Sequence, residues 1–162
     1  MFSAISLRVT LAEKITTSSF HAATTSISVW GDYLQVAKNG FKLAHGHSKD
    51  GHPELKQFLC GMIVNQEGIP LSCDIVSGNM SDKKWNEETL REIDGMIKGY
   101  GNIPYIADSA LITKNNLNLI ADKKLSFISR SPSTFSITED LKERAWDINR
   151  LYWVCRTRIK NL

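Results

Sequence analysis

The stretch QFLCGMIVNQEGIPLSCDIVSG, residues 57–78, decides the fold. Its first eight residues form a nearly continuous apolar run of strand length, which is typical of a strand buried on both faces. The next four, NQEG, supply turn chemistry. The last ten alternate, and this period predicts one strand face made of Ile69, Leu71, Cys73 and Ile75. Two strands joined by so short a turn predict an antiparallel hairpin, with the first strand inside a sheet.

The flanking patterns extend this hairpin into a mixed sheet. Upstream, residues 19–30 are rich in Ser, Thr and β-branched residues, which favours another strand. Downstream, helical and strand patterns alternate. We expect a helix over 85–97, a strand at PYIAD (104–108), a helix capped by Thr113, a strand at SFISR (126–130) and a helix opening at 138–140. This order predicts an α/β protein with the ribonuclease H-like mixed sheet and flanking helices.

Composition sets the broad class of the protein. The chain has 162 residues, of which 42% are hydrophobic and 23% charged, as in a soluble domain with a real core. No run approaches the roughly 20 apolar residues of a membrane helix, and the N-terminus lacks a signal-peptide pattern. We therefore expect a cytoplasmic protein with no membrane partner. Cys60, Cys73 and Cys155 share no metal-site spacing, and we interpret the first two as small buried hydrophobes.

Positive charge gathers near the C-terminus. The net charge is +3, from 20 Lys and Arg against 17 Asp and Glu. Six of those basic residues but only two of the acidic ones lie between Lys142 and Lys160, so this segment carries +4. Such a run favours DNA phosphates through counterion release, although it is also typical of a solvated helix face.

Several motifs in order resemble one subgroup of DDE-type insertion-sequence transposases. That subgroup carries H-x-D-T-T-S, then S-K-D-x-R-P-D-L-K-Q, a G-I-P-L strand, G-N-x-S-D and A-D-S-A-L. The corresponding stretches here are HAATTS (21–26), SKDGHPELKQ (48–57), GIPL (68–71), GNMSD (78–82) and ADSAL (107–111). The resemblance covers roughly residues 8–146.

The resemblance implies cleavage and joining of DNA by two Mg²⁺ ions that three carboxylates hold. Ala23 occupies the position of the first Asp. Asp108 occupies the second and is the expected catalytic and metal-binding residue. The third group is a Glu in a late-helix motif that this sequence lacks, and Glu139 and Glu143 do not have its context. We therefore expect a truncated, catalytically inactive copy whose sheet fold is incomplete at the C-terminus.

Within this interpretation, residues 1–18 are an N-terminal remnant, 19–150 a partial transposase core and 151–162 a basic tail. The expected partners are the DNA ends of the element and an intact transposase subunit. The expected DNA contacts are Lys49, His52, Lys56 and Arg130.

Two alternatives remain open. One is a remnant without catalytic activity that binds DNA or a transposase. The other is a zinc-dependent hydrolase that uses His45, His47 and His52, because two His at i and i+2 on a strand share a face.

Overall fold

The computed structural model describes residue 9 and residues 12–33, 41–93 and 102–148. The chain divides into two compact units, Met1–Arg130 and Ser131–Leu162, and each is described here by itself. The first unit contains the whole described sheet.

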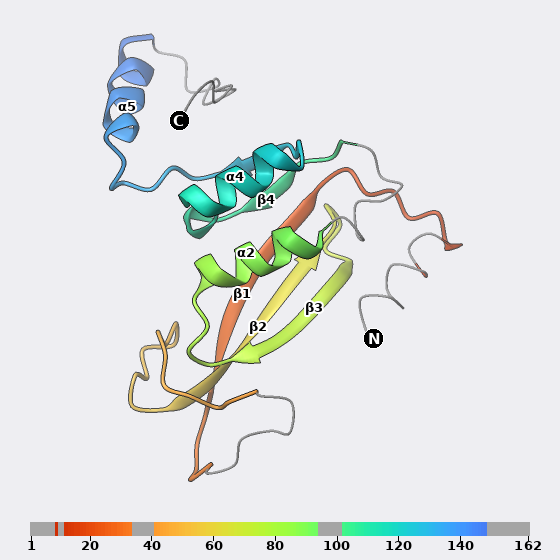
Figure 1. The fold of residues 1–162 in the computed structure, drawn as a ribbon, viewed down its shortest axis with the longest axis vertical. Helices are drawn as coiled ribbons and strands as arrows, with labels where there is room; N and C mark the ends of the chain where they lie inside the picture. The colour runs from red at the N-terminus through yellow and green to blue at the C-terminus, as the bar shows by residue number, and fades with distance from the viewer. Residues whose placement is uncertain (1–8, 10–11, 34–40, 94–101, 149–162) are drawn as a thin grey trace. The chain divides into compact units, whose positions relative to one another are not determined.

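The described strands form one five-stranded sheet with the order β3-β2-β1-β4-β5 (Figure 1). The first three strands are antiparallel, whereas β4 runs parallel to β1, and β5 runs parallel to β4. This mixed sheet with its flanking helices is the ribonuclease H-like arrangement that the sequence predicts. The strands are β1 (Phe20–Val29), β2 (Lys56–Val64), β3 (Pro70–Ser77), β4 (Tyr105–Ala107) and β5 (Phe127–Ser129).

The β2–β3 hairpin is confirmed, and its turn depends on one side chain. Asn65 Oδ1 accepts hydrogen bonds from the backbone N–H groups of Glu67 and Ile69. Gly68 has a φ of +79°, which L-residues with a side chain rarely adopt.

The expected alternation in β3 is wrong, because a bulge interrupts the pairing beside Ile63 and Val64. This irregularity leaves Leu71 and Ser72, which are consecutive residues, both buried. Cys73 and Ile75 then lie on the face opposite to Leu71. A strand with one extra residue changes the phase of its side chains, which the sequence pattern alone does not reveal.

Helices α2 (Asp82–Glu92) and α4 (Lys114–Asp122) lie on the same side of the sheet (Figure 1). Thr113 caps α4 as expected, since its Oγ1 accepts from the N–H of Asn116. The α2 helix begins three residues before the predicted position 85. Its N-cap is Ser81, whose Oγ accepts from the N–H of Lys84, and Asp82 is a first-turn residue. The predicted end of this helix, residues 94–97, lies outside the described residues.

The core lies between this helix pair and the sheet. Trp85 of α2 packs over β2 at Gly61, where a Cβ atom would come within 2.2 Å of the indole ring. Tyr105 is buried on β4, and its hydroxyl donates to Asn86 Oδ1. Burial raises the pKa of Tyr105 well above its ordinary value. The buried apolar residues that pack into this core cluster are Phe20, Ala22, Ile63, Leu71, Trp85, Leu90, Ile93, Tyr105, Leu111 and Ile120.

The other face of the sheet stays partly open, so the expectation that residues 57–64 are buried on both faces is wrong. Along β2, the buried residues from Gln57 to Ile63 alternate with half-buried ones from Phe58 to Val64. On the neighbouring strands of this second face, Ile27 is 41% exposed and Ile75 is 52% exposed. Only the interior position of β2 within the sheet is confirmed.

In the second unit, α5 (Ser136–Ile148) begins two residues before the predicted opening at 138. Thr138 Oγ1 donates to the carbonyl of Pro132 and fixes the entry to the helix. Among the described helices, none is long and apolar enough to cross a membrane.

Two glycines allow the segment before β2 to approach the end of β3. Ala44 pairs with Gln57, and the N–H of Gly78 donates to the carbonyl of Lys42. Gln57 is only 1% exposed, and its Nε2 donates to the carbonyl of Gly78 at 2.8 Å. A Cβ on Gly46 would lie 2.0 Å from that same carbonyl oxygen. The backbones therefore meet at a distance that only glycine allows.

We expect Gly78→Ala to destabilise the fold by about 3 kcal/mol or more, at or beyond the upper end of overpacking penalties. The new Cβ would lie 2.0 Å from the Gln57 carbonyl oxygen and 2.6 Å from that of Ala44, and neither backbone atom can turn aside. Urea unfolding measures the loss. The control is Gly51→Ala, which meets open space at a φ of +77° and should cost about 1–2 kcal/mol. Equal losses in the two variants would contradict the close approach.

Candidate functional site

Ala23 and Asp108 stand at the same level on neighbouring strands. The parallel pairing of β1 with β4 aligns His21 with Ile106. Two residues further along each strand come Ala23 and Asp108, the latter directly after the end of β4. Neighbouring strands lie about 4.8 Å apart, so side chains at these two positions are close enough to share a ligand. Both residues are exposed.

Asp108 also serves the local turn. Its Oδ1 accepts from the backbone N–H of Ala110 at 3.0 Å, which caps the short 3-10 helix η1 (Ser109–Leu111). Ser129 Oγ, from β5, donates to the Asp108 carbonyl at 2.7 Å. Asp108 is thus held through its carbonyl by Ser129, and one of its carboxylate oxygens is engaged by the N–H of Ala110. Its predicted catalytic and metal-binding role remains a prediction.

The residues around Ala23 do not fit a two-metal centre. Such a centre needs several carboxylates that converge on both ions, and the Ala23 methyl offers no lone pair. Among the described residues, no three His, Cys, Asp or Glu side chains come together as a metal site requires. None of the following three carboxylates supplies the ligand missing at position 23, since Asp82 is bound to Thr24 and Lys49, Asp74 lies on β3, and Asp32 follows the far end of β1. We therefore derive no metal-dependent step from this geometry.

Lys49 is the centre of a polar network on the helix-covered face of β1. Its Nζ donates to Thr24 Oγ1 at 2.8 Å and to the Thr24 carbonyl at 2.7 Å. The same Nζ lies 3.1 Å from Asp82 Oδ2, and Asp82 Oδ1 accepts from Thr24 Oγ1 at 2.6 Å. The network ties the motif loop (residues 46–52) to β1 and to the start of α2. Lys49 was predicted as a DNA contact, and here its charge is balanced by Asp82.

The motif loop is fastened at further points along β1. Ser26 Oγ accepts from the backbone N–H of Lys49, and Ser28 Oγ donates to Asp50 at 3.4 Å. Ser48 Oγ accepts from the N–H of His52. The S-K-D motif thus has a structural explanation in this fold. Its contacts to Ser26 and Ser28 lie 23 and 22 positions away in the chain, so the spacing of the motif does not reveal them.

The other three predicted DNA contacts lie near the end of β1, at the start of β2 and after β5. His52 Nδ1 lies 3.0 Å from Glu54 Oε1, and the His52 ring meets that of Trp30 edge-on at 6.0 Å. Hydrogen bonds from the Glu54 backbone and from His52 lower the pKa of Glu54. Lys56 Nζ donates to the carbonyl of Tyr33 at 2.7 Å. Arg130 is exposed after β5. Their role in binding DNA stays a prediction.

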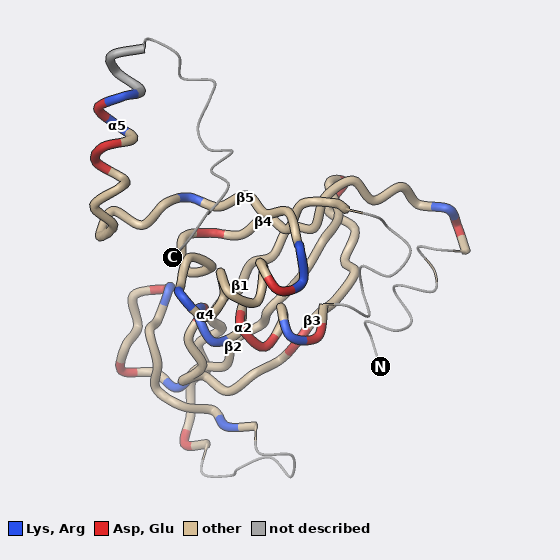
Figure 2. The backbone as a smooth tube through the Cα atoms, turned by 45° about the horizontal axis from the view of Figure 1, so that its top comes forward, with Lys and Arg blue, Asp and Glu red and all other residues tan. Residues whose placement is uncertain are grey.

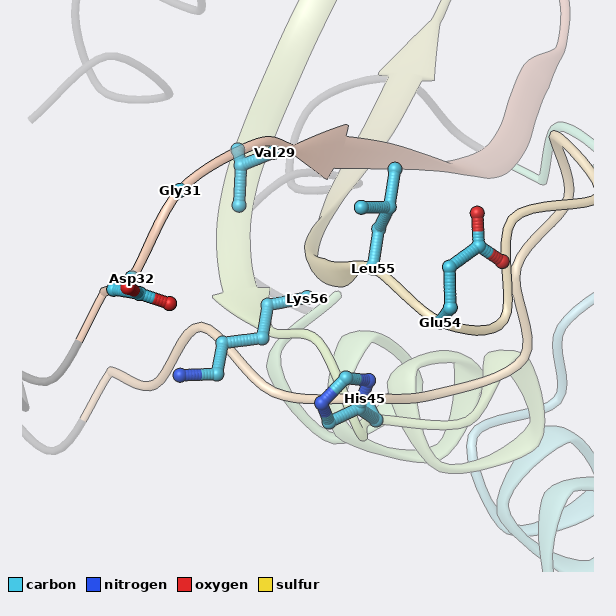
Figure 3. Close-up of a pocket in the computed structure, with 7 residues that line it drawn as sticks. All are labelled: Val29, Gly31, Asp32, His45, Glu54, Leu55 and Lys56. Carbon is cyan, nitrogen blue, oxygen red and sulfur yellow. The ribbon is translucent and has the colours of Figure 1, made fainter.

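The zinc alternative lacks a ligand set. His45, His47 and His52 do not form part of any group of three potential ligands in the described part of the chain. His45 instead lines a shallow hollow of about 360 Å³ between the end of β1 and the start of β2, together with Asp32, Glu54 and Lys56 (Figure 3). This hollow lies at the opposite end of β1 from Ala23, so it is separate from the Asp108 site.

No family model and no curated protein matches the chain. Solved structures similar to it include the catalytic domain of Mos1 mariner transposase, with 6% identity, a TM-score of 0.46, and coverage of 90% of this chain and 68% of that one. The same domain with raltegravir and Mg matches with 7% identity, a TM-score of 0.47, and 90% and 69% coverage.

A Mos1 transposase paired-end complex with the left transposon end matches with 6% identity and a TM-score of 0.45, over 91% of this chain and 53% of that one. The chain thus spans between about half and two thirds of these transposase chains. The ribonuclease H-like arrangement follows from the strand order and the mixed pairing of this sheet.

Proposed function

We propose that this chain is a transposase-derived ribonuclease H-like core that does not cut DNA. The observation that carries the proposal is that Ala23 on β1 and Asp108 after β4 lie at the same level on neighbouring strands. The motif order supports a transposase origin, because HAATTS falls on β1 and ADSAL falls at the end of β4, which are adjacent strands.

Loss of one carboxylate is sufficient for inactivity. Two Mg²⁺ ions in such a site activate the attacking oxygen and stabilise the leaving oxygen of a phosphodiester. Mg²⁺ surrenders its water reluctantly, so a lone exposed Asp108 holds it weakly. Thr24, beside Ala23 in sequence, points to the opposite face of β1 and is bound to Lys49 and Asp82. Neither Thr24 nor Asp82 therefore replaces the missing group.

The function that remains is binding without reaction, to DNA or to an intact transposase. β1 carries no Lys, Arg, Asp or Glu (Figure 2). The charge of Lys49 is balanced by Asp82. The basic segment Lys142–Lys160 provides the main excess of positive charge, although Lys142 pairs with Glu139, and residues 149–162 lie outside the described residues. We therefore propose weak DNA binding without sequence preference. The division into remnant, core and basic tail stays a prediction.

Restoring the carboxylate provides a direct test. We expect the unaltered chain to show neither Mg²⁺- nor Mn²⁺-dependent cleavage of DNA, and to bind Mn²⁺ weakly in electron paramagnetic resonance titrations. Ala23→Asp should tighten Mn²⁺ binding by about tenfold or more, because two carboxylates on neighbouring strands then face one ion.

Ala23→Asn is the matched control, since it adds the same bulk without the charge. The double variant Ala23→Asp with Asp108→Asn should lose the gained affinity. Cleavage by the unaltered chain above the level of Asp108→Ala would overturn the proposal of inactivity. Equal Mn²⁺ affinity in the Asp and Asn variants would show that positions 23 and 108 do not share a site.

DNA binding should depend on the basic segment and on salt. Contacts from about four cations predict a loss of roughly two decades of affinity over a fourfold rise in salt, since the slope is near −0.9 per phosphate. Fluorescence anisotropy on duplexes of unrelated sequence measures this slope. Deletion of residues 142–162 should flatten it. An unchanged slope after the deletion would instead place the contacts on the first unit, with Lys56 and Arg130 as candidates.

A further inference from the structure

Two thiols lie side by side on the partly open face of the sheet. Cys60 Sγ of β2 and Cys73 Sγ of β3 are 3.6 Å apart, and both residues are half-buried. The hairpin register sets Met62 directly opposite Cys73, and Met62 follows Cys60 by two residues on the same face. Opposed residues of an antiparallel pair have Cβ atoms about 5 Å apart. Two thiols and a thioether therefore share one small area.

The residues paired with them across the strands are uncharged, and several are reachable from solvent. Ile75, opposite Cys60, is 52% exposed, and Ala23, opposite Met62 on β1, is also exposed. On the same face, the Nε2 of His21 lies 2.8 Å from Ser19 Oγ. The area thus offers sulfur donors without a competing carboxylate on the same strand face.

We propose that Cys60, Cys73 and Met62 form a binding site for a soft monovalent d¹⁰ cation, Cu(I). Thiolate and thioether sulfurs are the ligands that select Cu(I) over hard ions. For metal–sulfur bonds of about 2.3 Å, two sulfurs on one ion lie roughly 3.8 Å apart. The observed 3.6 Å is close to that spacing. A disulfide would instead require the sulfurs to close to about 2.05 Å.

The proton balance of binding follows from the state of the thiols. Burial, the contact with Cys60 and the charge of Asp74 raise the pKa of Cys73. Each cysteine sulfur binds Cu(I) as a thiolate, so each thiol gives up its proton on binding. Binding of one Cu(I) forms two Cu–S bonds from the thiols and releases two protons to solvent, while Met62 adds a neutral donor. This site is independent of the proposed transposase origin and of Asp108.

The test is an anaerobic titration of the reduced full-length chain with Cu(I) against a chromophoric Cu(I) chelator. We expect one ion per chain, with an affinity that rises with pH by close to two logarithmic units per pH unit below the thiol pKa values. Cys60→Ala and Cys73→Ala should each lower the affinity by at least about 100-fold, since changes outside the ligand shell alone cost 10–100-fold. Each should also reduce the pH slope to one.

Met62→Leu, which keeps the apolar bulk, should weaken binding by about tenfold without changing the pH slope. The control is Cys155→Ser, which removes the remaining thiol and should leave binding intact. Far-UV circular dichroism checks that each variant is folded. Binding that survives both Cys→Ala variants, binding lost in Cys155→Ser, or no competition with the chelator would overturn the proposal. So would rapid closure of the pair to a disulfide by oxidised glutathione with no Cu(I) uptake before oxidation.

Discussion

The structure depends on β1, which pairs antiparallel with β2 on one side and parallel with β4 on the other. The antiparallel side has nine aligned residue pairs, and the parallel side has two. The chain must cross over the sheet between β3 and β4 to make the second pairing, and α2 lies on that crossover. This crossing covers one face of β1 and buries Phe20 and Ala22. It also brings the end of β4 beside position 23, where the two halves of the sheet meet.

Much of the fold could be predicted because its signals are local. The NQEG turn and the adjacent apolar run indicated the hairpin, and Thr113 indicated the start of α4. The errors arose where a distant partner decides the outcome. The bulge beside Ile63 depends on how β3 aligns with β2. The exposure of the second face depends on which elements cover it. An apolar run has the same sequence pattern whether both faces of the strand are buried or one of them is half-exposed.

The candidate site, like the fold, could be predicted only in part. Motif order placed Ala23 and Asp108 on neighbouring strands, because sheet topology follows from element order. It could not show that Lys49 is held by Asp82, 33 positions later in the chain, since an ion pair across the fold leaves no spacing signal. The Cys60–Cys73 pair was missed for a related reason. These thiols are 13 positions apart in the chain, and only the register of the hairpin makes them neighbours.

Deamidation of Gln57 would prevent this protein from refolding. Deamidation would replace its NH₂ group, which donates to Gly78, with a carboxylate that has no proton to donate. Two acceptors would then face each other in a buried position, which carries a large desolvation penalty. The folded chain shields the amide at 1% exposure, so hydrolysis proceeds from open forms. A deamidated chain would no longer form the hydrogen bond from residue 57 of β2 to Gly78 after β3. Deamidated molecules would therefore accumulate in the fraction that fails to refold.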